Sequence, residues 1–293
     1  MKYKIYYSLS HVVSTRSIKY FLSLPTIILL GLSLLINSST AFAENAEFYI
    51  NRGIKKATKG ELDNAILDYN KAIEIDPDSA DAYYNRAYDK ARAGNLEGAI
   101  ADYSKVIEIT PNDADAYFNR GNTKKILQKY KSSIIDYNKA ISINSKYTDA
   151  YYNRGNSKLQ LNQYLQSIED YDKVISINPQ YTDAYYNRGF AKSELGDSWD
   201  ALIDYDKVIK LNNRYHEAYY NRGYIKHSHL DYKGALKDYD KAIKLNPLDR
   251  NYYINRGITK SNLSDKKGAC LDWEEGYKFG AKKALKWIEE ECD

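Results

Sequence analysis

The sequence predicts an all-α protein, a solenoid of seven antiparallel helix pairs with a C-terminal capping helix. An Arg recurs at an interval of 34 residues: Arg52, Arg86, Arg120, Arg154, Arg188, Arg222 and Arg256. Sixteen residues after each Arg stands an Asp, followed by Tyr or, in the last unit, by Trp. Self-similarity at such a period is typical of a repeat protein, whose units bury their apolar faces only by stacking.

The first element, residues 1–43, is predicted to be a signal peptide. It contains no Asp or Glu, and basic residues precede the ten-residue apolar run Ile27–Ile36. Ala41-Phe42-Ala43 then presents the small residues that a signal peptidase accepts, so cleavage is expected before Glu44. The alternative is an uncleaved anchor, but a spanning helix needs roughly 20 apolar residues. We therefore expect an exported protein (periplasmic, lumenal or secreted) without membrane insertion after cleavage.

The charge of the remaining chain disfavours two classes of partner. The formal net charge of +4 comes from four basic residues within positions 1–43. Without them the chain holds 39 basic and 39 acidic residues. Such a balanced surface gives no electrostatic reason to expect nucleic acid or anionic lipid as a partner.

Residues 44–280 are predicted to form the seven-repeat solenoid, and the unit around 183–212 illustrates the pattern. Tyr185, Arg188 and Lys192 fall on one stripe of a first helix, which Gly196 ends. A second helix follows, and its apolar residues share one face: Ala201, Tyr205, Val208 and Ile209. Pro stands at the junction to the next unit in several repeats, where it cannot continue a helix.

The repeat resembles the tetratricopeptide repeat family. Its signature appears here as Tyr-x2-Arg-Gly-x2-Lys followed by Ala-x3-Tyr, for example Tyr185 to Lys192 and Ala201 to Tyr205. Arg stands where the family usually has Leu, and Lys where it has Tyr. The resemblance implies a right-handed superhelix and a non-catalytic scaffold that binds a protein or an extended peptide in its concave groove.

The last element, residues 281–293, is predicted to be a capping helix. Ala281, Ala284, Leu285 and Ile288 share one stripe, and the opposite face is charged. Because a solenoid end exposes an apolar face, a half-polar helix can close it. The only two cysteines, Cys270 and Cys292, flank this helix and are expected to form a disulfide in an exported chain.

The periodic Arg and Asp residues are interpreted as ion pairs that join the two helices of each unit. A guanidinium matches a carboxylate geometrically, and burial would make the pairing necessary. The alternative is a row of Arg that binds a ligand. The central pairs are Arg120–Asp136, Arg154–Asp170 and Arg188–Asp204.

The resemblance also places candidate ligand residues on the concave side. They are polar amides and aromatic rings of units three to five: Asn119, Asn153, Asn187, Asn122, Asn156, Phe118, Tyr152, Tyr186 and Phe190. Asp115, Asp149 and Asp183 lie beside them, where relatives that bind a peptide carboxylate carry cations; this favours a basic or polar ligand. The alternatives are that the rings pack between units and that the Asp residues cap helices.

Function remains open between two classes at this point. A protein or extended peptide partner is expected first, and a cell-envelope glycan stacking on the tyrosines is the alternative. His227 and His229 are two apart and diverge on a helix, so no metal site is expected. We find no catalytic constellation and expect no cofactor; the oligomeric state does not follow from the sequence.

Overall fold

The computed structural model describes residues 45–292, which form fifteen helices and no strands. The predicted signal peptide, residues 1–43, lies outside the described residues. In chain order the helices are α1 (Ala46–Thr58), α2 (Leu62–Ile75), α3 (Ala80–Arg92), α4 (Leu96–Ile109), α5 (Ala114–Ile126), α6 (Tyr130–Ile143), α7 (Thr148–Gln160), α8 (Tyr164–Ile177), α9 (Thr182–Glu194), α10 (Ser198–Leu211), α11 (His216–Ser228), α12 (Tyr232–Leu245), α13 (Arg250–Asn262), α14 (Lys266–Lys278) and α15 (Ala284–Glu291).

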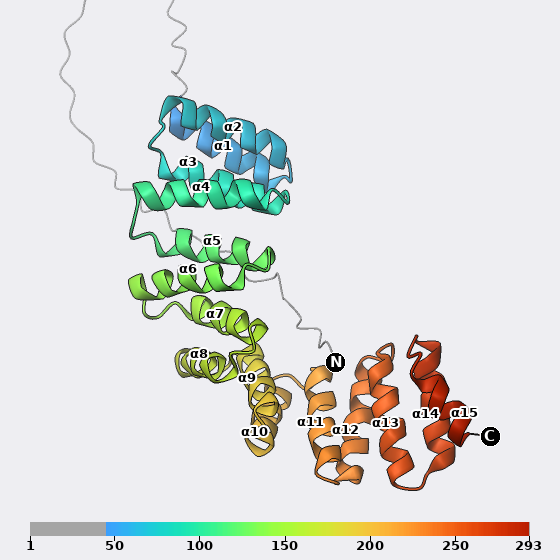
Figure 1. The fold of residues 1–293 in the computed structure, drawn as a ribbon. Coiled ribbons are helices and arrows are strands. Elements are labelled where there is room, and N and C mark those ends of the chain that lie inside the picture. The colour runs from blue at the N-terminus through green and yellow to red at the C-terminus, as the bar shows by residue number, and fades with distance from the viewer. Residues whose placement is uncertain (1–44, 293) are drawn as a thin grey trace, which may run out of the picture. The chain divides into compact units, whose positions relative to one another are not determined.

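The helices pair and stack in chain order, as Figure 1 shows. Each odd-numbered helix from α1 to α13 packs against the helix that follows it, and each pair packs against the next pair. Several successive odd-numbered helices also touch each other directly, as α3 touches α5 and α5 touches α7. The odd-numbered helices therefore form the inner side of the solenoid. The all-α solenoid of seven helix pairs is as predicted.

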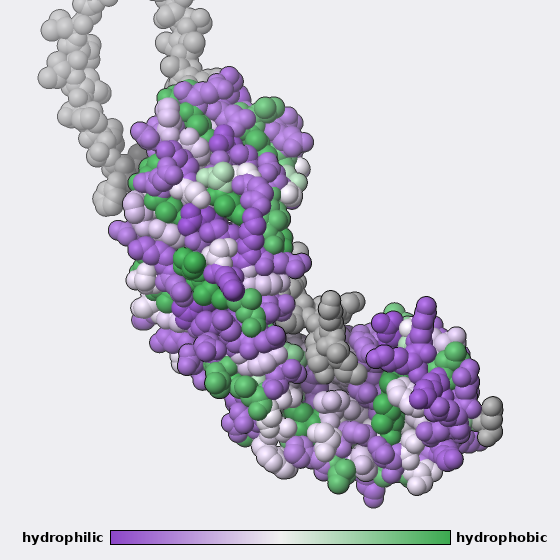
Figure 2. Space-filling model, viewed as in Figure 1, coloured by the Kyte–Doolittle hydropathy of each residue, from purple (hydrophilic) through white to green (hydrophobic). Residues whose placement is uncertain are grey.

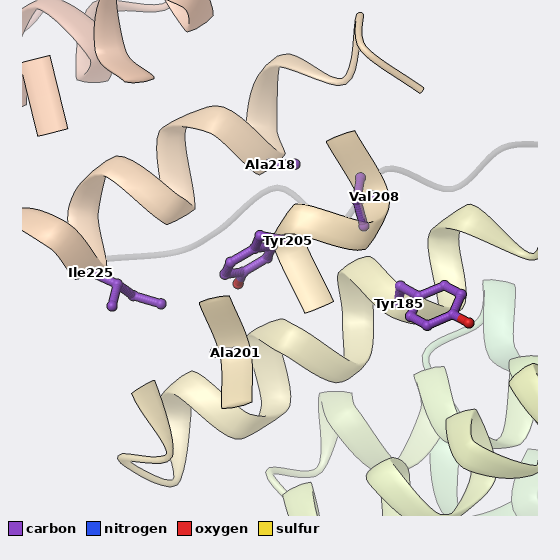
Figure 3. Packing of buried hydrophobic residues seen from close by; sticks show 6 residues of the cluster. All are labelled: Tyr185, Ala201, Tyr205, Val208, Ala218 and Ile225. Atoms are coloured by element: carbon purple, nitrogen blue, oxygen red, sulfur yellow. The ribbon is translucent and has the colours of Figure 1, made fainter. Parts of the chain in front are cut away.

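Small and aromatic residues alternate in the core of each helix pair. In the α9–α10 unit, Ala201 and Tyr205 are buried on α10, and Ala218 of the next unit packs against the same cluster (Figure 3). The ring of the second helix lies close to the backbone of the first. A Cβ added at Gly121 would lie 2.8 Å from Cε1 of Tyr137, so this position needs glycine.

The turn within each helix pair needs one residue in the left-handed region. Three units use glycine there, for example Gly196 with φ of 88°. Four others place a side chain at the same point: Gln128, Asn162, Leu230 and Ser264. Leucine is the least suited of these, because only Gly, Asn and Asp adopt this conformation at low cost.

The C-terminal helix α15 packs against α14, and a disulfide joins Cys270 to Cys292. Its contacts differ in part from the predicted stripe. Ala284, Ile288 and also Trp287 join the cluster around the buried Trp273, but Leu285 is 41% exposed. Leu285 lies off the side of α15 that packs on the solenoid, which carries Ala284, Trp287 and Ile288. The stripe prediction was wrong for Leu285, and Trp287 takes its place.

The surface of the solenoid is mixed in polarity over the face seen in Figure 2. Several large apolar side chains are more than half exposed, including Trp199, Ile203 and Leu230. Within residues 45–292, no helix is both long and apolar enough to cross a membrane.

Candidate binding face

Each Arg of the 34-residue period pairs with the Asp sixteen residues later. In the central unit, Arg154 Nη2 lies 2.5 Å from Asp170 Oδ1, and Nε is 3.0 Å from Oδ2, so the guanidinium binds both carboxylate oxygens. A Lys four residues after the Arg completes a triad: Lys158 Nζ is 2.9 Å from Asp170 Oδ2. The Asp side chain is almost fully buried, whereas the Arg and Lys side chains are 17% and 14% exposed.

The same triad recurs in all seven units. The Asp side chains are 1–6% exposed throughout. Two cations around one buried carboxylate favour its ionised form, and the Arg52 guanidinium, although burial opposes it, holds the pKa of Asp68 below its usual value. The Lys had stood out in the sequence only as a departure from the family pattern.

From the second unit onward, a second bond from each Arg reaches the preceding unit. Arg188 Nη1 donates to Asp172 Oδ1 of α8 at 2.5 Å, and Arg154 Nη1 donates to Asn138 Oδ1 of α6 at 2.7 Å. Burial opposes the charge of Arg188, but its hydrogen bonds to Asp204 and Asp172 raise its pKa above the ordinary value. Each Arg from Arg86 onward therefore joins three helices: its own helix, the second helix of its unit and the second helix of the preceding unit. The alternative reading as a ligand-binding row is not supported, because these donors are already used.

The Asn series also joins neighbouring units rather than facing outward. Asn119 Nδ2 donates to the Tyr84 hydroxyl at 2.7 Å, and Asn187 Nδ2 donates to the Tyr152 hydroxyl at 3.2 Å and to Asn156 Oδ1 at 2.9 Å. These three amides are 8%, 4% and 3% exposed. The prediction that Asn119, Asn156 and Asn187 present their amides to a ligand is thus corrected. They hold successive units in register.

The aromatic candidates divide in the same way. Phe118 is buried, and its ring centroid lies 4.8 Å from that of Tyr147 in the next unit. Tyr152 and Tyr186 are half-buried and lie 4.9 and 5.0 Å from Tyr181 and Tyr215. Phe118 therefore belongs to the core. Tyr152, Tyr186 and Phe190 are half-buried and lie on the inner side.

Two further candidate amides are half-buried. Asn153 Oδ1 accepts a hydrogen bond from Lys125 Nζ at 2.5 Å, and Asn122 Oδ1 accepts one from the Tyr137 hydroxyl at 2.8 Å. Burial lowers the pKa of Lys125 to about 8. At neutral pH this amine still carries most of its positive charge, so its hydrogen bond to Asn153 is charge-assisted.

A row of carboxylates crosses the inner side instead. One acid lies in the first turn of each of four successive odd-numbered helices: Asp115, Asp149, Asp183 and Glu217. We call these four residues the carboxylate row. The first three each accept a hydrogen bond from a Tyr of the next unit, for example Asp115 from the Tyr147 hydroxyl at 2.6 Å. All four residues are half-buried.

The tyrosine partners of this row keep their protons. Burial raises the pKa of Tyr147, and the hydrogen bond to Asp115 raises it further, so the phenol keeps its proton. Burial raises the pKa of Glu217, the fourth acid of the row, above its ordinary value. The sequence indicated these acids but not their tyrosine partners, although both recur at the 34-residue period.

The histidines do not gather into a metal site. His216 Nδ1 contacts the Tyr252 hydroxyl at 2.7 Å, and His227 Nδ1 contacts Thr259 Oγ1 at 2.9 Å. Throughout the described part of the chain, no cluster of three His, Cys, Asp or Glu side chains could hold a metal ion.

The chain belongs to the tetratricopeptide repeat family. Sequence profiles described as "TPR repeat" match residues 57–92, 90–125 and 155–196, and profiles described as "Tetratricopeptide repeat" match 114–147, 182–215 and 216–248. Proteins of this family typically act as non-enzymatic scaffolds for protein partners. No curated protein sequence matches the chain significantly.

Solved structures of repeat proteins are similar to this chain. A crystal structure of MamA is 28% identical, covers 55% of this chain and 95% of its own, and gives a TM-score of 0.54. YrrB, described as a TPR protein with an unusual peptide-binding site, is 27% identical, covers 61% and 92%, and gives 0.55. A tetratricopeptide repeat protein from Parabacteroides merdae covers 83% and 96% at 21% identity, with a TM-score of 0.62, which supports the fold alone.

Proposed function

We propose that this protein is an exported scaffold that binds a basic, extended protein segment along the inner side of units three to six. The observation that carries the proposal is the carboxylate row, which places one acid on each of four neighbouring helices. An extended chain offers a donor and an acceptor at every residue, and its Lys or Arg side chains pair with carboxylates. The similarity to YrrB, which has a peptide-binding site, supports the same class of ligand.

The cations nearby do not cancel this negative row. The Arg and Lys of each unit are engaged with the buried Asp of the second helix, as Arg188 and Lys192 are with Asp204. Lys125 on the inner side keeps most of its charge at neutral pH, although burial lowers its pKa to about 8, but it is a single cation against four acids. The carboxylate row repels an acidic ligand and so selects for a basic one. This selectivity costs the fold little stability.

The glycan alternative receives less support. A stacking platform needs an aromatic ring with an open face. Tyr152 and Tyr186 instead lie about 5 Å from Tyr181 and Tyr215, and their hydroxyls accept hydrogen bonds from Asn187 and Asn221. Tyr224, which lies on α11 four residues after Tyr220, is 43% exposed.

Export is part of the proposal and rests on two features. The basic and apolar pattern of residues 1–43 ends in Ala41-Phe42-Ala43, as signal peptides do. The disulfide between Cys270 and Cys292 fits an oxidising compartment. N-terminal sequencing of the protein from its host tests this, with Glu44 as the expected first residue and an intact Met1 as the contrary result.

Charge selectivity tests the binding proposal. Three unstructured peptides of equal length, rich in Lys, Glu or Gln, are titrated against the protein by fluorescence anisotropy. The Lys-rich peptide should bind tightest, and its affinity should fall with salt. Asp149→Asn with Asp183→Asn should weaken it about threefold to tenfold, because each accessible ion pair contributes about 0.2–1 kcal/mol.

The matched control is Glu169→Gln, which removes an exposed carboxylate from α8, outside the row. This variant should bind the Lys-rich peptide as the unchanged protein does. Equal affinity for all three peptides, or equal losses in the control and the double variant, would refute the proposed site.

A further inference from the structure

The first helix exposes the surface that every later unit buries. Phe48 occupies the position of Ala82, Ala116, Ala150, Ala184 and Ala218, all fully buried, yet Phe48 is 43% exposed. Asn51 occupies the position of the buried Asn119 and Asn187, yet it is exposed. A large apolar side chain thus stands at the end of the described solenoid, where no earlier described helix covers it.

This surface runs along one stripe of α1. Phe48, Asn51 and Lys55 are three and four residues apart and share a face, with Glu47 and Ile54 beside them. We call these five residues the α1 face. Lys55 stands where later units bury a small or polar residue, such as Thr123 or Ser157. On its own helix Phe48 packs against Arg52, whose guanidinium lies 5.2 Å from the ring centroid, and against Tyr49, whose ring centroid lies 5.5 Å away.

The charges on the α1 face are arranged to match a second copy of the same face. Glu47 lies four residues before Asn51, and Lys55 lies four residues after it. A two-fold axis at Asn51 would pair α1 with an antiparallel α1 and bring each Glu47 beside the Lys55 of the other copy. The two Asn51 amides would then meet, each with a donor and an acceptor, and the two Phe48 rings would be covered.

The other end of the solenoid does not offer a competing surface. There α15 covers the last helix pair, and the Cys270–Cys292 disulfide holds it. Head-to-tail stacking of copies needs both ends open, so only an isologous contact of one α1 face with another remains. This excludes an open filament and favours a closed pair.

We propose that the protein forms a two-fold symmetric dimer through the α1 face. The dimer leaves the inner side of units three to six untouched, since those helices lie further along the chain. It would present two copies of that side to one partner. The dimer does not depend on the peptide-binding proposal, and either can fail alone.

Sedimentation velocity over a range of concentrations tests the dimer. The sample is the chain from Glu44, which contains every described helix and its hydrophobic clusters, kept oxidised. Lys55→Glu should raise the dimer dissociation constant about tenfold or more, because symmetry places the same repulsion at two sites. Adding Glu47→Lys should restore association, since the exchanged charges attract again. Phe48→Ala should also weaken it.

Lys173→Glu, an exposed charge reversal on α8, is the matched control and should leave the dimer unchanged. Far-ultraviolet circular dichroism confirms that each variant is folded. A monomer at every concentration would overturn the proposal. So would a dimer that Lys55→Glu and Lys173→Glu weaken equally, or one that the exchanged pair does not restore.

Discussion

At the scale of residues, one buried carboxylate organises each unit. Asp170 accepts two bonds from Arg154 and one from Lys158, and Arg154 also reaches Asn138 of the preceding unit. A buried charge costs much free energy unless it is paired, so the triad is required once the Asp is present. The arrangement replaces the apolar contact that Leu provides in typical members of the family.

Removing one partner of this triad should therefore be costly. Arg154→Leu is expected to destabilise the protein by about 2–4 kcal/mol, because it leaves Asp170 buried with only Lys158. Asp170→Asn in the same chain should recover part of the loss. Denaturant melts of both single variants and the double variant measure the coupling.

Arg214→Leu, in the exposed segment between α10 and α11, is the control and should change the free energy of unfolding by less than about 0.5 kcal/mol. Strictly additive losses for Arg154 and Asp170 would contradict the pairing argument.

At the scale of elements, the turn within each helix pair varies in the residue at its left-handed position. Leu230 connects α11 to α12 with φ of 64° and is 71% exposed, so it gains little from burial and carries backbone strain. Gly60, Gly94 and Gly196 occupy the same point in other units. The turn at Leu230 thus has the same left-handed geometry as the glycine turns, although it lacks the preferred glycine.

Replacing this leucine should stabilise the turn. Leu230→Gly is expected to raise the free energy of unfolding by about 0.5–1 kcal/mol, because relief of the left-handed strain exceeds the added entropy of the unfolded glycine. The reverse change, Gly196→Leu, should lower it by a similar amount. Thermal melts of the two variants check the sign, and a loss of stability in Leu230→Gly would show that the leucine makes a contact worth more than the strain.

The sequence predicted elements far better than it predicted the site. The repeat period, the helix pairs and the C-terminal cap follow from residues that recur at a fixed interval. They recur because every unit must satisfy the same packing. Asn187 illustrates the limit. Helical spacing places it on the side away from α10, but it cannot show that the preceding unit lies there and that Tyr152 and Asn156 receive its amide.

The same limit affects the tyrosine partners of the carboxylate row. Tyr147 and Asp115 are 32 residues apart, and their contact depends on how two units stack. In a solenoid each unit contacts only its neighbours, so the fold depends on residues that are close in the sequence. The residues of the candidate site, in contrast, come together only when two units stack. The residues that form these contacts between units recur at the 34-residue period with little change.

At the scale of the whole molecule, the described helices form a continuous set of contacts with two different ends. The C-terminal end is closed by α15 and a disulfide, and the N-terminal end exposes the α1 face. Between them the inner side carries negative charge that the cations of the triads do not neutralise. In the function we propose, stability and binding therefore use separate sets of residues, and this separation is the central claim.

One paired measurement tests that claim most directly: denaturant melts and Lys-rich peptide titrations of Asn187→Ala and Asp183→Asn. Asn187→Ala should lose about 1–3 kcal/mol of stability and bind the peptide normally once folded, because its buried bonds serve the fold. Asp183→Asn keeps an oxygen for the Tyr215 hydroxyl, so it should retain its stability and bind more weakly. The opposite pattern, with Asn187→Ala weakening binding at unchanged stability, would contradict the account.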